Sequence, residues 1–332
     1  MNRRLACLRV GAALGMGAAA VQALAGPLDK GRLDAAARWV VHVDVEAVMR
    51  STTGSFIAEH RAELDLVPLE EFKARTGLDA LRDILDVTIY GTTDSSEDAV
   101  VIVRGTASLE SAVEEVMKGM PQVERPRIGN RDGYRWLENG TERFGCLLGS
   151  ADQGLRQFVV SREKARLEQA LRVLGQESPS LRGVADCPMA ADPKPGSMVF
   201  IAAADMTAAM ANAPRMLRGV KSIRIDMGED SEGMYGDAVL HTSNENDART
   251  ITDFGRGVLA VGRMACNGDL DLKGLSRAMD GVKLDAEGPE LRVSLRVSHE
   301  YLHAALSDLK AEAQSLKKDG PAIERTSQEK KR

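Results

Sequence analysis

The chain repeats one structural plan, and this repeat constrains its fold more than any other feature. Each half opens with an apolar strand that runs into a helical pattern, at Trp39–Val45 and again at Met198–Ala204. Each half closes with a strand, a serine suited to a helix N-cap, an acid two positions later and a helix. These closing segments begin at Val160 and Val297. Core packing, helix caps and turns therefore explain most of the residue pattern, and no catalytic function is needed to explain it.

Several of the expected strands are joined by short polar turns. The dipeptides Asp132-Gly133 and Asn139-Gly140 are strong turn formers between short strands. Antiparallel hairpins with helices to one side predict an α+β fold with a mostly antiparallel sheet, rather than a doubly wound parallel sheet. The order of elements in each half is similar to a ferredoxin-like β-α-β-β-α-β unit with an extra strand and helix. We therefore expect an internal duplication of two ferredoxin-like halves, which either pack side by side or share one long sheet.

Hydrophobic periodicity and turn residues place the individual elements. Strands are expected at 39–45, 86–90, 99–103, 134–138, 143–148, 156–160, 198–204, 220–227, 234–241, 282–285 and 291–297. Helices are expected at 46–57, 69–81, 109–117, 162–174, 205–217, 244–264, 272–279 and 299–316. Ser108, Ser161 and Ser298 are the expected N-caps, and Gly175 is the expected C-terminal glycine of its helix.

Changes of composition divide the chain into five predicted segments. Residues 176–196 contain four prolines and lose all periodicity, so they are the predicted linker between the halves. The last residues are charged with little apolar content, which favours disorder. The segments are 1–25, a signal peptide; 26–175, the first α+β half; 176–196, the linker; 197–316, the second α+β half; and 317–332, a disordered charged tail.

The N-terminus has the pattern of an export signal. Three arginines within residues 1–9 precede an apolar stretch rich in alanine and glycine, which ends in Ala23-Leu24-Ala25. This pattern predicts a signal peptide cleaved near Ala25 and a periplasmic or secreted protein. The apolar stretch is shorter than the ~20 residues of a membrane span, and we expect no transmembrane segment in the mature chain. The Arg3-Arg4 pair leaves the general and the twin-arginine export routes open.

Composition argues against several classes of function. Removal of residues 1–25 takes away three arginines and no acid, and it changes the net charge from −5 to −8. Such a chain lacks the clustered positive charge of a nucleic-acid-binding protein, and an aromatic content of 4% disfavours base stacking. The odd number of cysteines that remain leaves at least one thiol outside any internal disulfide. One bridge and three buried thiols are both open for Cys146, Cys187 and Cys266.

The first expected strand carries a resemblance to known proteins. The segment Leu33–Asp44, which contains Trp39-Val-Val-His42-Val-Asp44, resembles the opening of a group of uncharacterised exported bacterial proteins. Those proteins begin, after the signal peptide, with small residues and a W-V-x-H-x-D-like strand. The resemblance implies export and an α+β layout, and it implies no activity and no site.

One motif has the pattern of a zinc peptidase, His299-Glu300-Tyr301-Leu302-His303. Positions i and i+4 of a helix face the same way, so both imidazoles would hold one Zn²⁺. Glu300 would then activate a metal-bound water. A third ligand is required, and the extended form of the motif is absent because Leu306 stands where that form has glycine.

Two observations favour a structural interpretation of this motif. Only 29 residues follow His303, and the acids Glu312 and Glu324 among them do not lie on a recognisable second helix. The matching position of the first half has Ser161-Arg162-Glu163, with the same serine and acid but no histidine. Ser298 is then a helix cap, and Glu300 is an acid that the helix dipole favours in the first turn.

Other polar groups also have a structural and a functional interpretation. His42 and Asp44 lie on one face of the first strand, about 7 Å apart, as an acid–base pair or as a polar strand face. The segment Asp226–Asp237 is rich in carboxylates, but its spacing does not match a calcium-binding loop. A similar acidic turn at Asp94–Asp98 favours solvated hairpin tips at both places.

We therefore expect an exported, non-enzymatic protein that acts by binding or assembly, with a protein partner or a second copy pairing with its sheet edges. This interpretation assigns no catalytic, cofactor or metal-binding residue and expects no cofactor. The alternative is a zinc-dependent hydrolase that uses His299, Glu300 and His303. A third option is a pocket for a small apolar ligand between the halves, lined by some of the 14 methionines.

Overall fold

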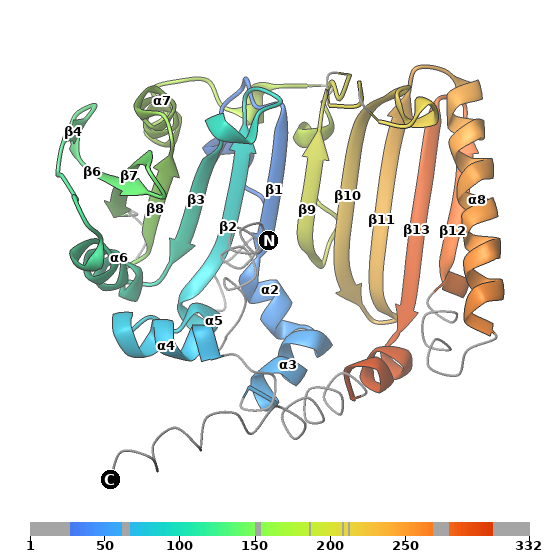
Figure 1. Ribbon diagram of the computed structural model, residues 1–332, viewed down its shortest axis with the longest axis horizontal. Coiled ribbons are helices and arrows are strands. Elements are labelled where there is room, and N and C mark those ends of the chain that lie inside the picture. Colours follow the sequence, from blue (N-terminus) through green and yellow to red (C-terminus); the bar gives the residue numbers. More distant parts are fainter. Residues whose placement is uncertain are drawn as a thin grey trace, which may run out of the picture.

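One antiparallel sheet of eleven strands runs through the protein (Figure 1). The computed structural model describes residues 27–61, 67–149, 154–185, 187–207, 209–211, 213–267 and 279–307. The order of the strands across the sheet is β12-β13-β11-β10-β9-β1-β2-β3-β8-β7-β6, and each neighbouring pair is antiparallel. The predicted α+β class with a mostly antiparallel sheet is therefore confirmed.

The elements have the following bounds. The sheet consists of β1 (Trp39–Asp44), β2 (Ile84–Gly91), β3 (Val100–Gly105), β6 (Tyr134–Glu138), β7 (Thr141–Gly149), β8 (Arg156–Ser161), β9 (Ser197–Ala203), β10 (Val220–Asp230), β11 (Gly233–Thr242), β12 (Val282–Glu287) and β13 (Glu290–Ser298). A small hairpin pairs β4 (Arg127–Ile128) with β5 (Arg131–Asp132). The α-helices are α2 (Val45–Arg50), α3 (Thr52–Glu59), α4 (Val67–Thr76), α5 (Ala80–Asp83), α6 (Ser108–Gly119), α7 (Lys164–Leu174) and α8 (Glu245–Asn267). Short 3₁₀ turns are η1 (Lys30–Arg32), η2 (Ser96–Asp98), η3 (Leu181–Gly183), η4 (Pro188–Ala190) and η5 (Arg215–Leu217).

The β1–β9 pair joins two groups of strands in the middle of the sheet. Trp39 lies opposite Ala203, and Val43 lies opposite Val199. The first group continues outward as β2, β3, β8, β7 and β6, and the second group continues as β10, β11, β13 and β12. The two parts of the chain thus share one sheet, which is one of the two arrangements that the sequence leaves open.

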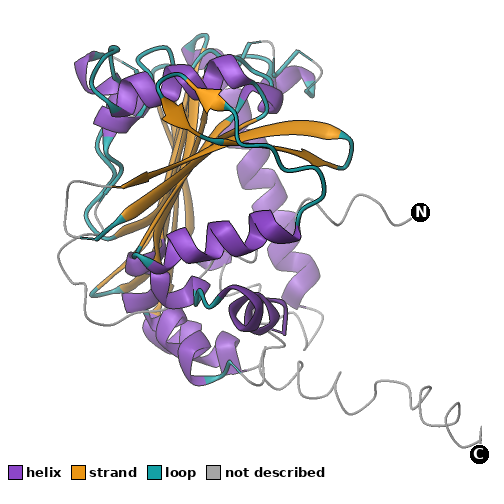
Figure 2. Ribbon diagram, turned by 90° about the vertical axis from the view of Figure 1, so that its left-hand side faces the viewer, coloured by secondary structure: helices purple, strands orange, loops and turns teal. Residues whose placement is uncertain are grey.

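Alternating burial along β1 gives the sheet two distinct faces. Val40, His42 and Asp44 point to the side on which α7 packs, which we name the α7 face. Val41 and Val43 point to the opposite side, which we name the α6 face. Figure 2 shows the sheet nearly edge-on, with helices on both of its sides.

Three apolar clusters hold the helices on these faces. The first lies on the α7 face, where Leu167 and Leu171 of α7 pack with Ile102 and Phe200 of the sheet. The second lies on the α6 face beneath α4 and α6. The third joins Ile251 of α8 to the α6 face of the second group. Apolar burial of this kind supplies most of the favourable free energy of folding.

The proline-rich segment 176–196 is part of this packing. It crosses the α7 face through η3 and η4, and the side chains of Leu181 and Met189 are fully buried in the same cluster as α7.

The structure corrects several predicted helices. The described part of residues 205–217 forms turns and the short η5, because Asp205 has a positive φ of 49° and Pro214 lacks a backbone N–H. The predicted helix 46–57 is divided at Ser51, which ends α2 and whose hydroxyl caps α3 by accepting the N–H of Gly54. Similarly, Asp79 caps α5 and separates it from α4.

Two of the predicted caps are also wrong. Ser108 is the first residue of α6 and makes no capping hydrogen bond, since the N–H of Leu109 bonds to the carbonyl of Thr106 instead. Ser161 accepts the N–H of Glu163 at 3.3 Å, but the N-cap residue of α7 is Glu163, and no side chain makes a capping hydrogen bond there. Gly175 follows α7 as expected and donates its N–H to the carbonyl of Leu171.

Several predicted segments lie outside the described residues. These are the signal peptide 1–25, the helix 272–279 except for its last residue, and everything from 308 onward, including the tail 317–332. Among the helices of the described residues, none combines the length and the apolar content that a membrane crossing needs.

Candidate binding surface

The predicted cap at the start of the last helix is confirmed. Ser298 is the final residue of β13, and its hydroxyl accepts the N–H of Tyr301 at 3.3 Å. Residues 299–307 are helical, so the His299–His303 motif occupies the first turns of a helix, as the sequence predicts.

The two histidines of this motif have different surroundings. His299 is half-buried, and its Nε2 donates to the carbonyl oxygen of Asp230 at 3.0 Å. Its Nδ1 lies 3.3 Å from the hydroxyl of Thr52 and 3.4 Å from a carboxylate oxygen of Glu229. His303 is exposed to solvent. Both ring nitrogens of His299 are thus engaged by protein groups.

No metal site forms around this motif within the described residues. Nowhere in that part of the chain do three or more His, Cys, Asp or Glu side chains meet in an arrangement suited to a metal ion. Glu300 is exposed and lines a separate shallow pocket beside Arg296 and Tyr301. Glu312 and Glu324 lie outside the described residues. The zinc-hydrolase interpretation therefore stays a prediction.

The second predicted pair, His42 and Asp44, is buried at the centre of the sheet. Nδ1 of His42 lies 2.9 Å from the hydroxyl of Thr88 on β2. Asp44 is the N-cap of α2 and accepts the N–H of Ala47 at 2.8 Å. The pair thus connects β1 to its neighbouring strand and to the following helix.

The surroundings of Asp44 change its acidity. Burial raises the pKa of its carboxyl to about 6, with a further contribution from the charge of Asp86 directly opposite on β2, although the hydrogen bond from Ala47 opposes this rise. Burial also raises the pKa of Asp86, and the ion pair with Arg104 at 2.8 Å opposes that effect. Two acids with raised pKa values therefore face each other inside the first group.

The carboxylates of the acidic segment 226–237 are distributed among different contacts. Glu229 bonds to Thr52, and Asp230 pairs with Arg296. Asp226 is buried and accepts the backbone N–H of Lys194 at 3.0 Å. This arrangement does not gather the carboxylates at the hairpin tip.

Cys146 and Cys187 are free thiols. Cys146 is buried, and Cys187 is half-buried at the margin of the same apolar cluster. The side chain of Cys266 lies outside the described residues.

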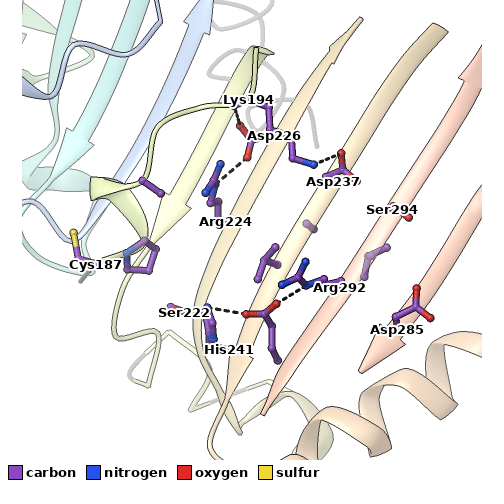
Figure 3. A pocket seen from close by; sticks show the side chains of 16 residues that line it. Cys187, Lys194, Ser222, Arg224, Asp226, Asp237, His241, Asp285, Arg292 and Ser294 are labelled. Atoms are coloured by element: carbon purple, nitrogen blue, oxygen red, sulfur yellow. Dashed lines mark hydrogen bonds and ion pairs between the residues drawn. The ribbon is translucent and has the colours of Figure 1, made fainter. Parts of the chain in front are cut away.

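A wide hollow lies on the α7 face of the second group, and we name it the open sheet face (Figure 3). It has a volume of about 850 Å³. Its floor is formed by β10, β11, β13 and β12, and its rim includes the linker segment near Cys187 and Lys194. The polar and charged residues that line it are Lys194, Ser222, Arg224, Asp226, Asp237, His241, Asp285, Glu290, Arg292 and Ser294.

Ion pairs organise this surface. Arg224 pairs with Asp226 at 2.9 Å, and the amine of Lys194 pairs with Asp237 at 2.8 Å. On β13 Glu290 lies 2.5 Å from the guanidinium of Arg292.

One acid on this surface remains available to a ligand. Asp285 of β12 is exposed and makes no ion pair with any other described residue. The open sheet face thus carries three cations and four acids, together with His241 beside Glu290. It suits a partner that presents both signs of charge.

The sequence alone did not lead to this surface, although the alternation of polar and apolar residues that forms it is present in the sequence. Along β13, Arg292 and Ser294 alternate with Leu291 and Val293, and the apolar positions face α8 while the polar positions face the hollow. Alternation of this kind is typical of an antiparallel sheet with one wet face. The predicted strand 291–297 lies within β13, but a pattern along one strand does not indicate which polar strands lie beside it.

Comparisons with known proteins give no family for the chain. No family model matches it, and no curated protein matches it. Among solved structures, crystal form III of TP0453 has 9% sequence identity and a TM-score of 0.40, and the match covers 85% of this chain and 98% of that chain. Crystal form I of TP0453 has 10% identity and a TM-score of 0.39, covering 87% of this chain and 99% of that chain. At these values no property of TP0453 is carried over to this chain.

Proposed function

We propose that this is an exported, non-enzymatic binding protein that holds a protein partner on the open sheet face. The observation that carries the proposal is a difference between the two groups of strands. On the α7 face of the first group, α7 and the linker segment bury the sheet, whereas the same face of the second group is a charged hollow of about 850 Å³. Export is proposed from the leader pattern of residues 1–25.

The chemistry of the hollow supports a protein partner. Arginine is enriched at protein interfaces, and polar groups of both signs give specificity and register to an association. Arg224 and Arg292 lie on strands of a rigid sheet, so a partner meets them in fixed positions. Their ion pairs with Asp226 and Glu290 hold the guanidinium groups in place before binding.

The repeated strand order supports a duplicated origin for the two groups. Outward from the β1–β9 pair, each group has three strands in chain order and then strands in reverse order, β8-β7-β6 in the first group and β13-β12 in the second. We infer that both groups derive from one plan of the ferredoxin-like kind predicted above. The second group then differs in leaving its α7 face open.

The sheet edges support this location over pairing between edge strands. Helix α8 packs beside β12, and Arg256 donates a hydrogen bond to the carbonyl of Leu284 at 2.8 Å. At the opposite edge, Arg135 of β6 exchanges two backbone hydrogen bonds with Glu124. Both outermost strands thus have a neighbour on part of their outer side, which is a common way of blocking edge pairing.

A second candidate function, self-assembly of identical chains, is favoured by one feature of α8. Phe254, Val258, Val261 and Met264 are 53% to 77% exposed and follow one another at spacings of three or four residues, so they form a stripe on one side of the helix. Two copies that pair these stripes would bury both of them in an isologous contact. Sedimentation of the parent and of Val261→Glu distinguishes this candidate, since only self-assembly through α8 predicts a parent dimer that the variant loses.

Charge reversal on the open sheet face tests the main proposal. Arg292→Glu changes that face, and Arg249→Glu is its matched control, because both arginines pair with a glutamate and are 65% and 70% exposed. The unmodified protein and each variant are used to capture proteins from a cell-envelope extract of the source organism, and the captured proteins are compared. We expect Arg292→Glu to weaken capture of a defined partner about tenfold while Arg249→Glu retains it. Equal capture by all three chains contradicts the proposal.

A further inference from the structure

A second hollow, on the α7 face of the first group, has the character of an anion site. It has a volume of about 600 Å³ and lies between the end of α7, η1, η3 and the adjoining ends of β7 and β8. Three arginines line it, Arg32, Arg131 and Arg182, and Asp29 is its only acid. We name it the arginine pocket. It carries a formal charge of +2 in a chain whose net charge is −5.

One carboxylate positions two of the arginines. Asp29 caps η1, and its Oδ1 accepts the N–H of Gly31 at 2.9 Å and Nη2 of Arg182 at 2.8 Å. Its Oδ2 lies 3.2 Å from Nε of Arg32. A Cβ atom at Gly31 would lie 2.9 Å from Nη2 of Arg182, so the absence of a side chain there leaves room for that guanidinium.

The acid stays charged in these surroundings. Burial alone would raise the pKa of Asp29, but the hydrogen bond from Gly31 and the charges of Arg32 and Arg182 outweigh it and hold the pKa below its ordinary value. The two guanidinium groups are thus kept close together at neutral pH, with their mutual repulsion reduced by the carboxylate between them.

Two further groups at the pocket are not satisfied by the described protein. Arg131, on the β4–β5 hairpin, is exposed and makes no ion pair within the described part of the chain. The Oε1 atom of Gln157 on β8 is buried and has no hydrogen-bond partner among the described residues. A buried polar atom without a partner costs about 1–3 kcal/mol, which a bound ligand recovers. Rotation of the Gln157 side-chain amide by 180° exchanges its oxygen and its NH₂ group, and the NH₂ group then donates a hydrogen bond to an anion in the pocket.

We propose that the arginine pocket binds a small, polar phosphate monoester. A phosphate group carries about −1.5 to −2 charges at pH 7, which matches the charge of the pocket. Arginine binds phosphate oxygens with two parallel hydrogen bonds, and three arginines from separate segments surround one such group. The volume lies within the range of small-molecule sites and exceeds the needs of phosphate alone. Gln157, Gln176, Ser178 and Ser180 also line the pocket and favour a hydroxylated remainder of the ligand.

Binding of glycerol 3-phosphate and of inorganic phosphate tests this site. Titration calorimetry is carried out on the full chain at constant ionic strength, with chloride as the balancing anion. The variant Arg131→Gln removes one cation without breaking a described ion pair. Its matched control, Arg127→Gln, lies on the same hairpin outside the pocket. We expect saturable binding of glycerol 3-phosphate that Arg131→Gln weakens about tenfold or more and that Arg127→Gln leaves unchanged.

A vesicle arm identifies the source of the phosphate group. Phosphatidylcholine vesicles with and without phosphatidic acid are sedimented with the parent and both variants. Arg131-dependent binding of the soluble ester identifies a free metabolite, and Arg131-dependent binding only to phosphatidic acid identifies a lipid headgroup. The proposal is overturned by the absence of saturable binding to every probe, or by equal effects of the two substitutions. Because this pocket is separate from the open sheet face, neither result bears on the proposed partner.

Discussion

Glu229 of β10 accepts the backbone N–H of Thr52 with both of its carboxylate oxygens, at 3.0 and 2.9 Å, although 177 positions separate the two residues. Thr52 is the first residue of α3, so a carboxylate from the second group of strands caps a helix that follows the first strand of the sheet. The Thr52 hydroxyl also donates to Glu229, and His299 lies against both side chains. This contact joins the two groups at a second place besides the β1–β9 pair.

Glu229→Ala is expected to lower the free energy of unfolding by about 1.5–3 kcal/mol, because it removes a charged acceptor and leaves the Thr52 N–H without its partner. The measurement is urea unfolding followed by circular dichroism. Glu232→Ala, at the exposed tip of the same hairpin, is the control and should change stability by less than about 0.5 kcal/mol. Equal losses in the two variants would argue against the capping role of Glu229.

Asp44→Asn is expected to make the protein more stable at pH 7. The pKa of Asp44 rises on folding from 3.8 to about 6, so the folded state holds the proton more tightly than the unfolded state. The free energy of unfolding of the parent therefore falls as the pH rises through this window, by up to about 3 kcal/mol. Asparagine keeps the cap of α2 without this cost. Urea unfolding from pH 4 to pH 7 checks the prediction, which fails if both chains show the same pH dependence.

Arg104→Met is expected to destabilise the protein by about 3–5 kcal/mol, because it leaves Asp86 buried without its ion-pair partner. The double variant Asp86→Asn with Arg104→Met removes both charges and should recover much of this loss. A double-mutant cycle by thermal unfolding measures the coupling. If the double variant is as unstable as the sum of the single variants, the two side chains do not act as a pair.

Zinc content tests the hydrolase alternative. The parent and His303→Ala are purified without a polyhistidine tag, and zinc per chain is measured together with the melting temperature. We expect the same low zinc content and the same melting temperature in both, because His299 is engaged by Asp230 and Thr52 and His303 is exposed. About one zinc per parent chain and none in the variant would establish the metal site instead.

Sequence patterns located the strands because alternation and turn dipeptides are local signals. β6 has the predicted bounds, the strand at 39–45 extends one residue beyond β1, and the strand at 198–204 is shifted by one residue from β9. Local signals were weaker for helices, since a cap such as Ser51 or Asp79 divides a continuous apolar pattern. The helix expected at 205–217 had the right periodicity, but one positive φ and one proline prevent it.

The sites depend on contacts that no local pattern contains. The open sheet face forms because β10, β11, β13 and β12 align their polar positions, and this alignment depends on strand order. The arginine pocket brings together residues from η1, the β4–β5 hairpin and η3. A tertiary contact between such distant segments becomes visible only when the register of the sheet is known.

The central β1–β9 pair also has a consequence for how the chain acquires its structure. Its two strands lie about 150 residues apart in the sequence, so a long loop must close before either strand has both of its neighbours. Until then β1 and β9 are each an apolar edge, the kind of surface on which chains aggregate. A chain cut within residues 176–196 would therefore yield two aggregation-prone fragments rather than two independent domains. During synthesis, the first group needs protection from other chains until β9 arrives.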